Sequence, residues 1–356
     1  MNPKFSFFIP NVLLSILTEH FMGWQIGELM TETHLRRPDY NAFQLTRRVH
    51  NNSLEDHDMA VVEKRKVISG ITVGEAMRRQ VISLPISADI GQGIRMMIRN
   101  KTNAVLLLTD QSVPFGVVSK TDLMGAFYAE FPAETPLGDV VGNQPIACFS
   151  DDPLEEAIEL MDASGVHQLY IIGASRDVVI GVVTYSDIVG LLYRYCRDCE
   201  WGTKKKRVKH SEIDPSARLK VKEVMTQNVF TCQEKDQLFT IIEILSTHHM
   251  GAVLVQNETQ SSVGVISKTD LILAYNHGVT PETQARVIMN TPVHCVQAEQ
   301  FLSIAIEQML IKDVQRLFVH SDASNPDLIC GVLALSDAAR FRSGSCRACT
   351  PGRLLI

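Results

Sequence analysis

The chain has 356 residues, 45% of them hydrophobic and 21% charged, with a formal net charge of −6. This length allows two or more domains with their own cores, and the composition is that of a soluble globular protein. The acidic balance argues against a general nucleic-acid binder, and eight scattered cysteines are too few for a disulfide scaffold. We therefore expect reduced thiols and a cytoplasmic location.

Residues 1–58 are interpreted as an amino-terminal appendage. Its apolar stretch Phe5–Leu17 is interrupted by Pro10 and Asn11 and is shorter than the roughly 20 residues that span a bilayer. A signal peptide would need a small-residue cleavage site after this stretch, and the sequence TEHF follows instead. We expect no membrane span.

Past the appendage, one seven-residue phrase occurs four times. It reads GVVSKTD at 116–122, GVVTYSD at 181–187, GVISKTD at 264–270 and GVLALSD at 331–337. Each copy predicts a buried strand that ends in a turn, followed by a helix. The hydroxyl residues expected to cap these helices are Thr121, Ser186, Thr269 and Ser336. Asp122 and Asp270 are 148 residues apart, as are Met77 and Met225, so the chain contains two copies of a two-module unit.

The residues before each phrase predict the rest of the module. A short opening (VGEAM, LGDVV, VKEVM or ARVIM) is followed by a strand, at 81–84, 146–149, 229–232 and 293–296. An amphipathic helix comes next, shown best by Leu238, Ile241, Ile242 and Leu245. A second strand follows at 104–108, 169–172, 252–255 and 317–319. The order β-α-β-β-α predicts an α+β fold with a partly parallel sheet in each module.

These patterns divide the chain into modules and connecting segments. The predicted modules are 71–132, 137–200, 218–280 and 285–342, with a linker at 201–217 and a tail at 343–356. Pairing module one with two, and three with four, would bury the exposed sheet faces of such small units. The linker contains KKKRVKH, which is typical of nuclear-import or nucleic-acid segments, but the acidic remainder favours a solvated linker.

The module order, the openings and the four phrases resemble CBS domains, named after cystathionine β-synthase. The resemblance covers residues 71–342. It implies that the modules pair into Bateman units, whose two clefts commonly bind adenine nucleotides or S-adenosylmethionine. It also implies a regulatory protein, not an enzyme, that acts on a partner protein.

The resemblance also assigns roles to residues of the phrase. The implied ribose ligands are Asp122, Asp187, Asp270 and Asp337, and the implied phosphate ligands are Ser119, Thr184, Ser267 and Arg316. A helix amino terminus suits phosphate, although Asp and Ser/Thr at these positions also occur as ordinary helix caps. The fourth phrase has Ala334 at the hydroxyl position, so we expect its cleft to be altered. Few cations are apparent, which favours AMP, adenosine or S-adenosylmethionine over ATP.

Two CxxC motifs indicate a second candidate function, metal binding or thiol redox chemistry. Cys196 and Cys199 form CRDC, Cys346 and Cys349 form CRAC, and each motif begins nine residues after its module's Asp. Four thiolates could hold zinc or an iron–sulfur cluster, and each pair could form a disulfide, but a relic of duplication would look the same.

The hypothesis that the resemblance favours is a non-enzymatic sensor of an adenosine-containing ligand. An enzyme is the least supported hypothesis, because no GxxxxGK[ST], GxSxG or HExxH motif is present. The alternative is a metal-binding or thiol-redox protein on the same scaffold. The two units are expected to pair within one chain or in a homodimer, and no nucleic-acid partner is expected.

Overall fold

The computed structural model describes residues 71–173, 178–198, 219–322 and 325–340. By its internal contacts the chain divides into two units, Met1–Asn52 and Ser53–Ile356, and all described residues belong to the second unit. The predicted appendage at 1–58 lies outside the described residues.

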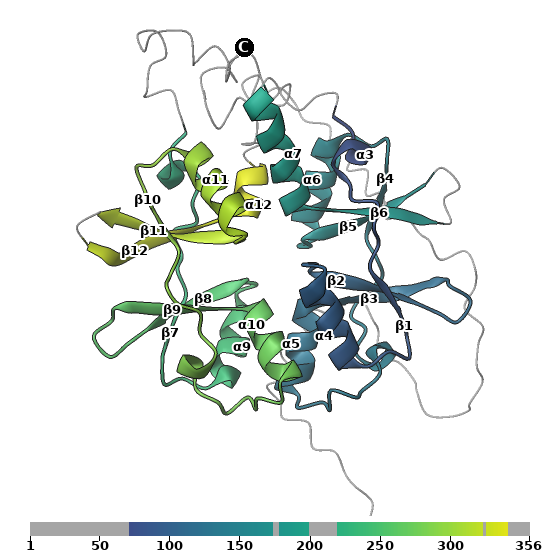
Figure 1. The fold of residues 1–356 in the computed structure, drawn as a ribbon, viewed down its shortest axis with the longest axis horizontal. Helices are drawn as coiled ribbons and strands as arrows, with labels where there is room; N and C mark the ends of the chain where they lie inside the picture. The colour runs from purple at the N-terminus through teal and green to yellow at the C-terminus, as the bar shows by residue number, and fades with distance from the viewer. Residues whose placement is uncertain (1–70, 174–177, 199–218, 323–324, 341–356) are drawn as a thin grey trace, which may run out of the picture. The chain divides into compact units, whose positions relative to one another are not determined.

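The same order of elements occurs four times along the described chain (Figure 1). The first set comprises α3 Val73–Ala76, β1 Ser83–Pro85, α4 Ile90–Arg99, β2 Ala104–Leu108, β3 Pro114–Ser119 and α5 Lys120–Tyr128. The second comprises η1 Leu137–Asp139, β4 Ala147–Phe149, α6 Leu154–Ala163, β5 Gln168–Ile172, β6 Val179–Thr184 and α7 Tyr185–Asp198. The third comprises η3 Val221–Glu223, β7 Thr231–Gln233, α9 Leu238–Thr247, β8 Ala252–Gln256, β9 Ser262–Ser267 and α10 Lys268–Asn276. The fourth comprises η4 Ala285–Val287, β10 Cys295–Gln297, α11 Leu302–Lys312, β11 Arg316–Asp322, β12 Asn325–Ala334 and α12 Leu335–Arg340.

Each set forms a three-stranded sheet with one parallel and one antiparallel pairing. In the first set β1 runs parallel to β2, with Ser83 opposite Leu106, and β2 runs antiparallel to β3. The other three sheets repeat this order. The predicted β-α-β-β-α order and the partly parallel sheet are therefore confirmed. The first strand of each set begins one or two residues later than predicted, because only three of its residues pair with the second strand.

The opening of each set packs on the neighbouring set. Thr72, just before α3, pairs with Pro153, just before α6, and the amide of Val73 donates to the carbonyl of Asp152 at 3.0 Å. In the reverse direction, Leu137 lies against Gly93 of α4. The two sets are thus interlocked by exchange of their openings, and sets three and four repeat the arrangement.

Sheet faces join the sets in pairs, as predicted. Leu106 of β2 packs in one buried cluster with Tyr170 of β5 and Val182 of β6. An equivalent cluster of Leu254, Phe318 and Val332 joins the third and fourth sets. These clusters are small because each sheet presents only a few apolar side chains to its neighbour.

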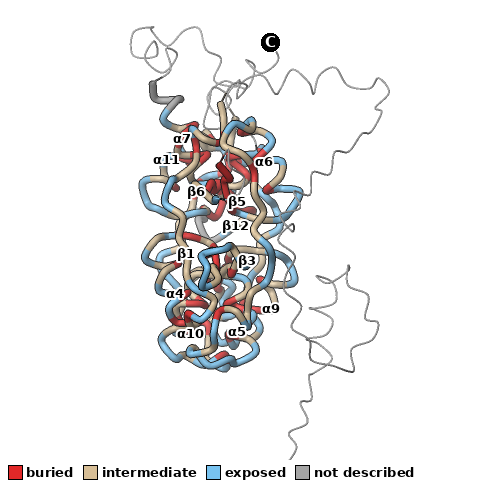
Figure 2. Tube along the Cα trace, turned by 90° about the vertical axis from the view of Figure 1, so that its right-hand side faces the viewer, coloured by how far each residue is buried: buried red, intermediate tan, exposed pale blue. Residues whose placement is uncertain are grey.

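The larger cores cross between the two pairs. Buried side chains of α4 and α5 form one cluster with those of α9 and α10, and α6 and α7 do the same with α11 and α12. Figure 2 marks buried residues in red near α4, α5 and α10 and near α6, α7 and α11. The rings of Phe127 and Tyr275 stack at 4.9 Å, and the Tyr128 hydroxyl donates to Glu243 Oε1 at 2.7 Å. Of the two predicted modes of pairing, the structure thus contains the one within a single chain.

Candidate functional site

Each third strand passes directly into a helix, and this junction positions the candidate site. α5 begins at Lys120, and its N-cap is Ser119; likewise Ser267 is the N-cap of α10. The prediction that Thr121, Ser186, Thr269 and Ser336 cap these helices was therefore wrong. Because no turn separates strand from helix, these hydroxyl residues lie inside the first turn.

The implied ribose and phosphate ligands bond to one another at these helix starts. Both the amide and the hydroxyl of Ser119 donate to Asp122 Oδ2 at 2.7 Å. The same reciprocal cap joins Thr184 to Asp187 and Ser267 to Asp270. A hydroxyl has one proton, so it cannot donate to phosphate while it donates to the carboxylate. These roles stay predictions, and they require the cap to rearrange.

The fourth helix start differs, as Ala334 indicated. Only the amide of Ala334 donates to Asp337 Oδ2, at 2.8 Å, because no hydroxyl is available. The guanidinium of Arg340 lies 3.9 Å from Asp337 Oδ1 and also pairs with Asp162 of α6. An arginine therefore stands beside the carboxylate that would otherwise face a ligand.

The residue opposite each carboxylate comes from the opening of the paired set. Arg78 is bridged to Val182, and its Nε lies 2.9 Å from Asp187 Oδ1 and 3.1 Å from Oδ2. Asn290 is bridged to Val265 and donates from Nδ2 to Asp270 Oδ1 at 2.7 Å. Equivalent backbone bridges join Asn143 to Val117 and Thr226 to Val332, in the strands that lead to Asp122 and Asp337.

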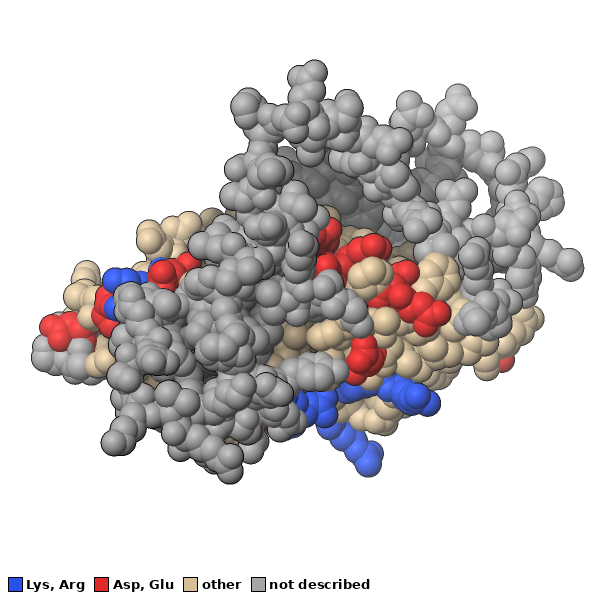
Figure 3. All heavy atoms as spheres, turned by 90° about the horizontal axis from the view of Figure 1, so that it is seen from above, with Lys and Arg blue, Asp and Glu red and all other residues tan. Residues whose placement is uncertain are grey.

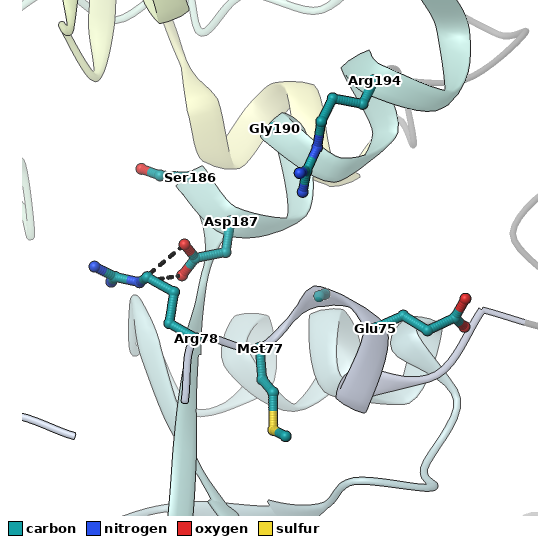
Figure 4. Close-up of a pocket in the computed structure, with 8 residues that line it drawn as sticks. Glu75, Met77, Arg78, Ser186, Asp187, Gly190 and Arg194 are labelled. Carbon is teal, nitrogen blue, oxygen red and sulfur yellow. Dashed lines mark hydrogen bonds and ion pairs between the residues drawn. The ribbon is translucent and has the colours of Figure 1, made fainter. Parts of the chain in front are cut away.

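The cleft at Asp187 has a volume of about 410 Å³ and lies between the start of α7 and the α3 segment. Its lining residues are Glu75, Ala76, Met77, Arg78, Ser186, Asp187, Gly190 and Arg194. Figure 4 shows the guanidinium groups of Arg78 and Arg194 on opposite sides of Asp187. A Cβ on Gly190 would meet no atom within 4 Å, so this part of the cleft is open.

Sequence reasoning missed Arg78 and Arg194. Arg78 reaches Asp187 only because the opening of one set crosses to the next, which no local pattern indicates. Arg194 could have been found, because it lies seven residues after Asp187 on the same face of a helix.

A second group of cations lies where the helix starts of different sets meet. Lys120 donates to Thr269 Oγ1 at 2.9 Å, and Lys268 donates to Thr121 Oγ1 at 2.8 Å, so each lysine crosses to the other pair. Burial, followed by the charge of Arg316, lowers the pKa of each lysine to about 8. Burial also lowers the pKa of Arg316 to about 10. We call Lys120, Lys268 and Arg316 the central cations.

Burial also shifts the pKa values of three further side chains, His167, Asp122 and Asp337. Desolvation of the His167 ring, with the charges of Lys268 and Arg316, lowers its pKa to about 4 although part of the residue is exposed. A small cavity of about 30 Å³ is lined by His167, Arg316 and the start of α12. Burial raises the pKa of the Asp122 and Asp337 carboxyls. The central cations are partly desolvated, and such cations are expected to attract an anion.

α6 carries several acidic side chains. They are Glu155, Glu156, Glu159 and Asp162, and acidic side chains gather on the face seen in Figure 3. The acidic side chains of α6 do not suit the phosphate backbone of nucleic acid. Lys120 and Lys268 lie instead at the starts of α5 and α10.

The CxxC cysteines lie mostly outside the described residues. Cys196 is on α7 but its side chain is not described, and Cys199, Cys346 and Cys349 fall in segments beyond the described ranges. Within those ranges, no cluster of three or more His, Cys, Asp or Glu side chains could hold a metal ion. The zinc, iron–sulfur and redox hypotheses thus stay predictions.

Comparison with known proteins identifies the repeated unit. The family model of the CBS domain matches residues 73–129, 137–194 and 221–277. This chain is a CBS-domain protein. The fourth set lies outside the matched segments but repeats the same order of elements. None of the helices in the described CBS modules and their connections is long and apolar enough to cross a membrane.

Two archaeal proteins are similar in sequence. Uncharacterized protein MJ1225 of Methanocaldococcus jannaschii is 22% identical over 200 residues, which are 56% of this chain and 68% of that protein. Uncharacterized protein MK0525 of Methanopyrus kandleri is 30% identical over 119 residues, 33% of this chain and 59% of that protein. The crystal structure of MJ1225 superimposes with a TM-score of 0.62 at 16% identity, covering 76% of this chain and 100% of that one. This similarity shows a shared fold.

Proposed function

We propose that this CBS-domain protein is a regulatory sensor that binds an adenosine-containing ligand, with AMP as the first candidate. The cleft at Asp187 carries the proposal. Its volume of about 410 Å³ falls in the range of small-molecule sites. A carboxylate, a helix start and two arginines converge on it, and these groups match a ribose diol beside a phosphate.

The central cations support a phosphorylated ligand. Lys120 and Lys268 are costly to keep charged at their partly buried positions, since their pKa values fall to about 8. A bound phosphate would return each pKa toward its ordinary value and so favour the liganded state. The preference for low-charge ligands rested on few visible cations, and the structure adds Arg78, Arg194 and both lysines. AMP is therefore favoured over uncharged adenosine.

The regulatory part of the proposal follows from the contacts between the pairs of modules. Lys120 and Lys268 each bond to a threonine of the other pair, so an anion that binds them would change contacts between the two pairs of modules. Such a change can be read by a partner protein without any catalytic group. The partner remains to be identified by capture experiments with and without ligand.

Calorimetric titration with AMP tests the proposal. We expect saturable binding, a rise in melting temperature, and at least tenfold weaker binding in Asp187→Ala, since losing a charged acceptor costs about 1.5–3 kcal/mol. Asp122→Ala and Asp270→Ala should each remove a further part of the binding. The matched control is Asp337→Ala, where Arg340 already stands beside the carboxylate. If AMP, adenosine and S-adenosylmethionine all fail to bind below millimolar concentration, the sensor hypothesis is wrong.

A further inference from the structure

Of the three guanidinium nitrogens of Arg78, the described part of the structure bonds one, Nε. Its Nε contacts both oxygens of Asp187, at 2.9 and 3.1 Å. Within the described ranges, no hydrogen bond or ion pair is recorded for its two terminal nitrogens. Figure 4 shows this end pointing away from Asp187, and the Arg78 side chain is 40% exposed against 14% for Asp187.

The backbone holds Arg78 firmly in this position. Its amide donates to the carbonyl of Val182 at 2.8 Å, and the amide of Val182 donates back at 2.9 Å. A Cβ on Gly181 would lie 2.7 Å from the Arg78 carbonyl oxygen, so the two segments approach closely. Arg78 is thus fixed both at its backbone and, through Nε, near the end of its side chain. Little freedom remains to be lost when a ligand binds to the terminal nitrogens.

The residue bridged beside each of the other three helix starts is neutral. Asn143, Thr226 and Asn290 form the equivalent bridges, and Asn290 contacts its carboxylate in the same way as Arg78. Only at Asp187 is the residue in this bridged position a cation, whereas at Asp337 the cation beside the carboxylate, Arg340, comes from the same helix. This difference between otherwise equivalent clefts indicates a difference in ligand charge.

We propose that Arg78 makes the Asp187 cleft selective for a nucleoside monophosphate over the free nucleoside, which rests on the function proposed above. Nε stays on Asp187, and the terminal nitrogens donate two parallel hydrogen bonds to phosphate oxygens. Asp187 is then shared between Arg78 and the ribose. A free nucleoside offers Arg78 no second anion, and its ribose must compete with the guanidinium for the carboxylate.

Calorimetry on Arg78→Thr tests this selectivity. Threonine is the residue found at the equivalent position 226, so the backbone should accept it. AMP and adenosine are titrated in a parent that carries Asp122→Ala and Asp270→Ala, so that the Asp187 cleft dominates the signal. We expect Arg78→Thr to weaken AMP about tenfold or more, with adenosine unchanged or slightly tighter. Arg78→Lys should recover only part of the AMP affinity, because an ammonium lacks the paired nitrogens.

The matched control is Arg79→Thr, which removes the same charge at an exposed neighbour that does not line the cleft. It should leave the ratio of AMP to adenosine affinity unchanged. Equal losses of AMP and adenosine in Arg78→Thr would show a structural role, and an equal effect of Arg79→Thr would show a general charge effect. Either result overturns the inference. A parent that binds AMP with a ratio unaffected by Arg78→Thr refutes the inference alone, and so does a parent that binds neither ligand while the wild-type protein binds AMP. A wild-type protein that binds neither ligand refutes the proposed function as well.

Discussion

Replacing Lys120 by Met should stabilise the unliganded protein and weaken its binding of phosphate. Burial lowers the pKa of Lys120 from 10.5 to about 8, so the charged form is disfavoured in the folded state at neutral pH. At about 1.4 kcal/mol for each pKa unit, the upper estimate of this cost is on the order of 3 kcal/mol. The hydrogen bond to Thr269 Oγ1, which the substitution removes, offsets about 1 kcal/mol of it.

The net gain in the free energy of unfolding at pH 7 is therefore on the order of 1–2 kcal/mol, after allowance for partial exposure. This corresponds to a rise in melting temperature of about 2–6 °C in a domain of this size. The sign of the pH dependence follows from the lowered pKa. The cost is fully present below pH 8 and disappears as the pH rises toward 10.5, because the unfolded chain then binds the proton that the folded chain has lost. The advantage of Lys120→Met should shrink across this window.

Thermal unfolding at pH 7 and 9.5, together with AMP titration, measures both effects. The control is Lys235→Met, because Lys235 is exposed, pairs with Glu258 and has no lowered pKa. A loss of stability in Lys120→Met at pH 7, or an advantage that does not change with pH, would contradict the argument. Higher stability with undiminished AMP affinity would instead remove Lys120 from the ligand site.

Further outcomes are expected at other positions. Ala334→Ser should raise stability by about 0.5–1 kcal/mol in chemical denaturation, because α12 would gain a side-chain cap; no gain would mean that the hydroxyl cannot reach. Asp337→Ala should leave AMP affinity within about twofold in calorimetry, and a large loss would contradict the roles assigned to the four clefts. The thiols of Cys148 and Cys232 should resist alkylation in the native protein at pH 7.5, since burial raises the pKa of each to about 12; rapid labelling would show that these strands open. If the CxxC pairs share a metal, anaerobically purified protein should contain zinc or iron and lose most of it in Cys346→Ala, whereas metal-free protein whose thiols all remain free after mild oxidation would exclude both metal and redox roles.

The fold could be predicted from the sequence because its determinants are local. The apolar face of α9 is read directly from the spacing of Leu238, Ile241, Ile242 and Leu245, all of which are buried. The exchange of openings could not be predicted in this way. It depends on contacts such as Thr72 with Pro153, which are distant in sequence and leave no periodic pattern. The large cores between α5 and α10, or α7 and α12, are hidden for the same reason.

The candidate site was predictable only in part. The carboxylates at the helix starts were found because they lie in a repeated phrase. The caps were misplaced by two residues because two hydroxyls precede each of the first three Asp residues, and Ser119 rather than Thr121 has the spacing of a capping box. The cations were underestimated because Lys120 and Arg78 acquire their roles through contacts with other sets, at Thr269 and Asp187.

Duplication gives four equivalent helix starts, but the side chain one turn after the carboxylate differs among them. Three residues after the carboxylate the four helices carry Gly125, Gly190, Leu273 and Arg340. A Cβ on either glycine would meet no atom within 4 Å, whereas Arg340 lies beside Asp337. The helices after Asp122 and Asp187 therefore have open space at this position, whereas at Asp337 an arginine side chain lies beside the carboxylate. Because an occupied cleft must also tolerate the residue opposite, the four sites should differ in affinity, and fewer than four ligands should bind to each chain.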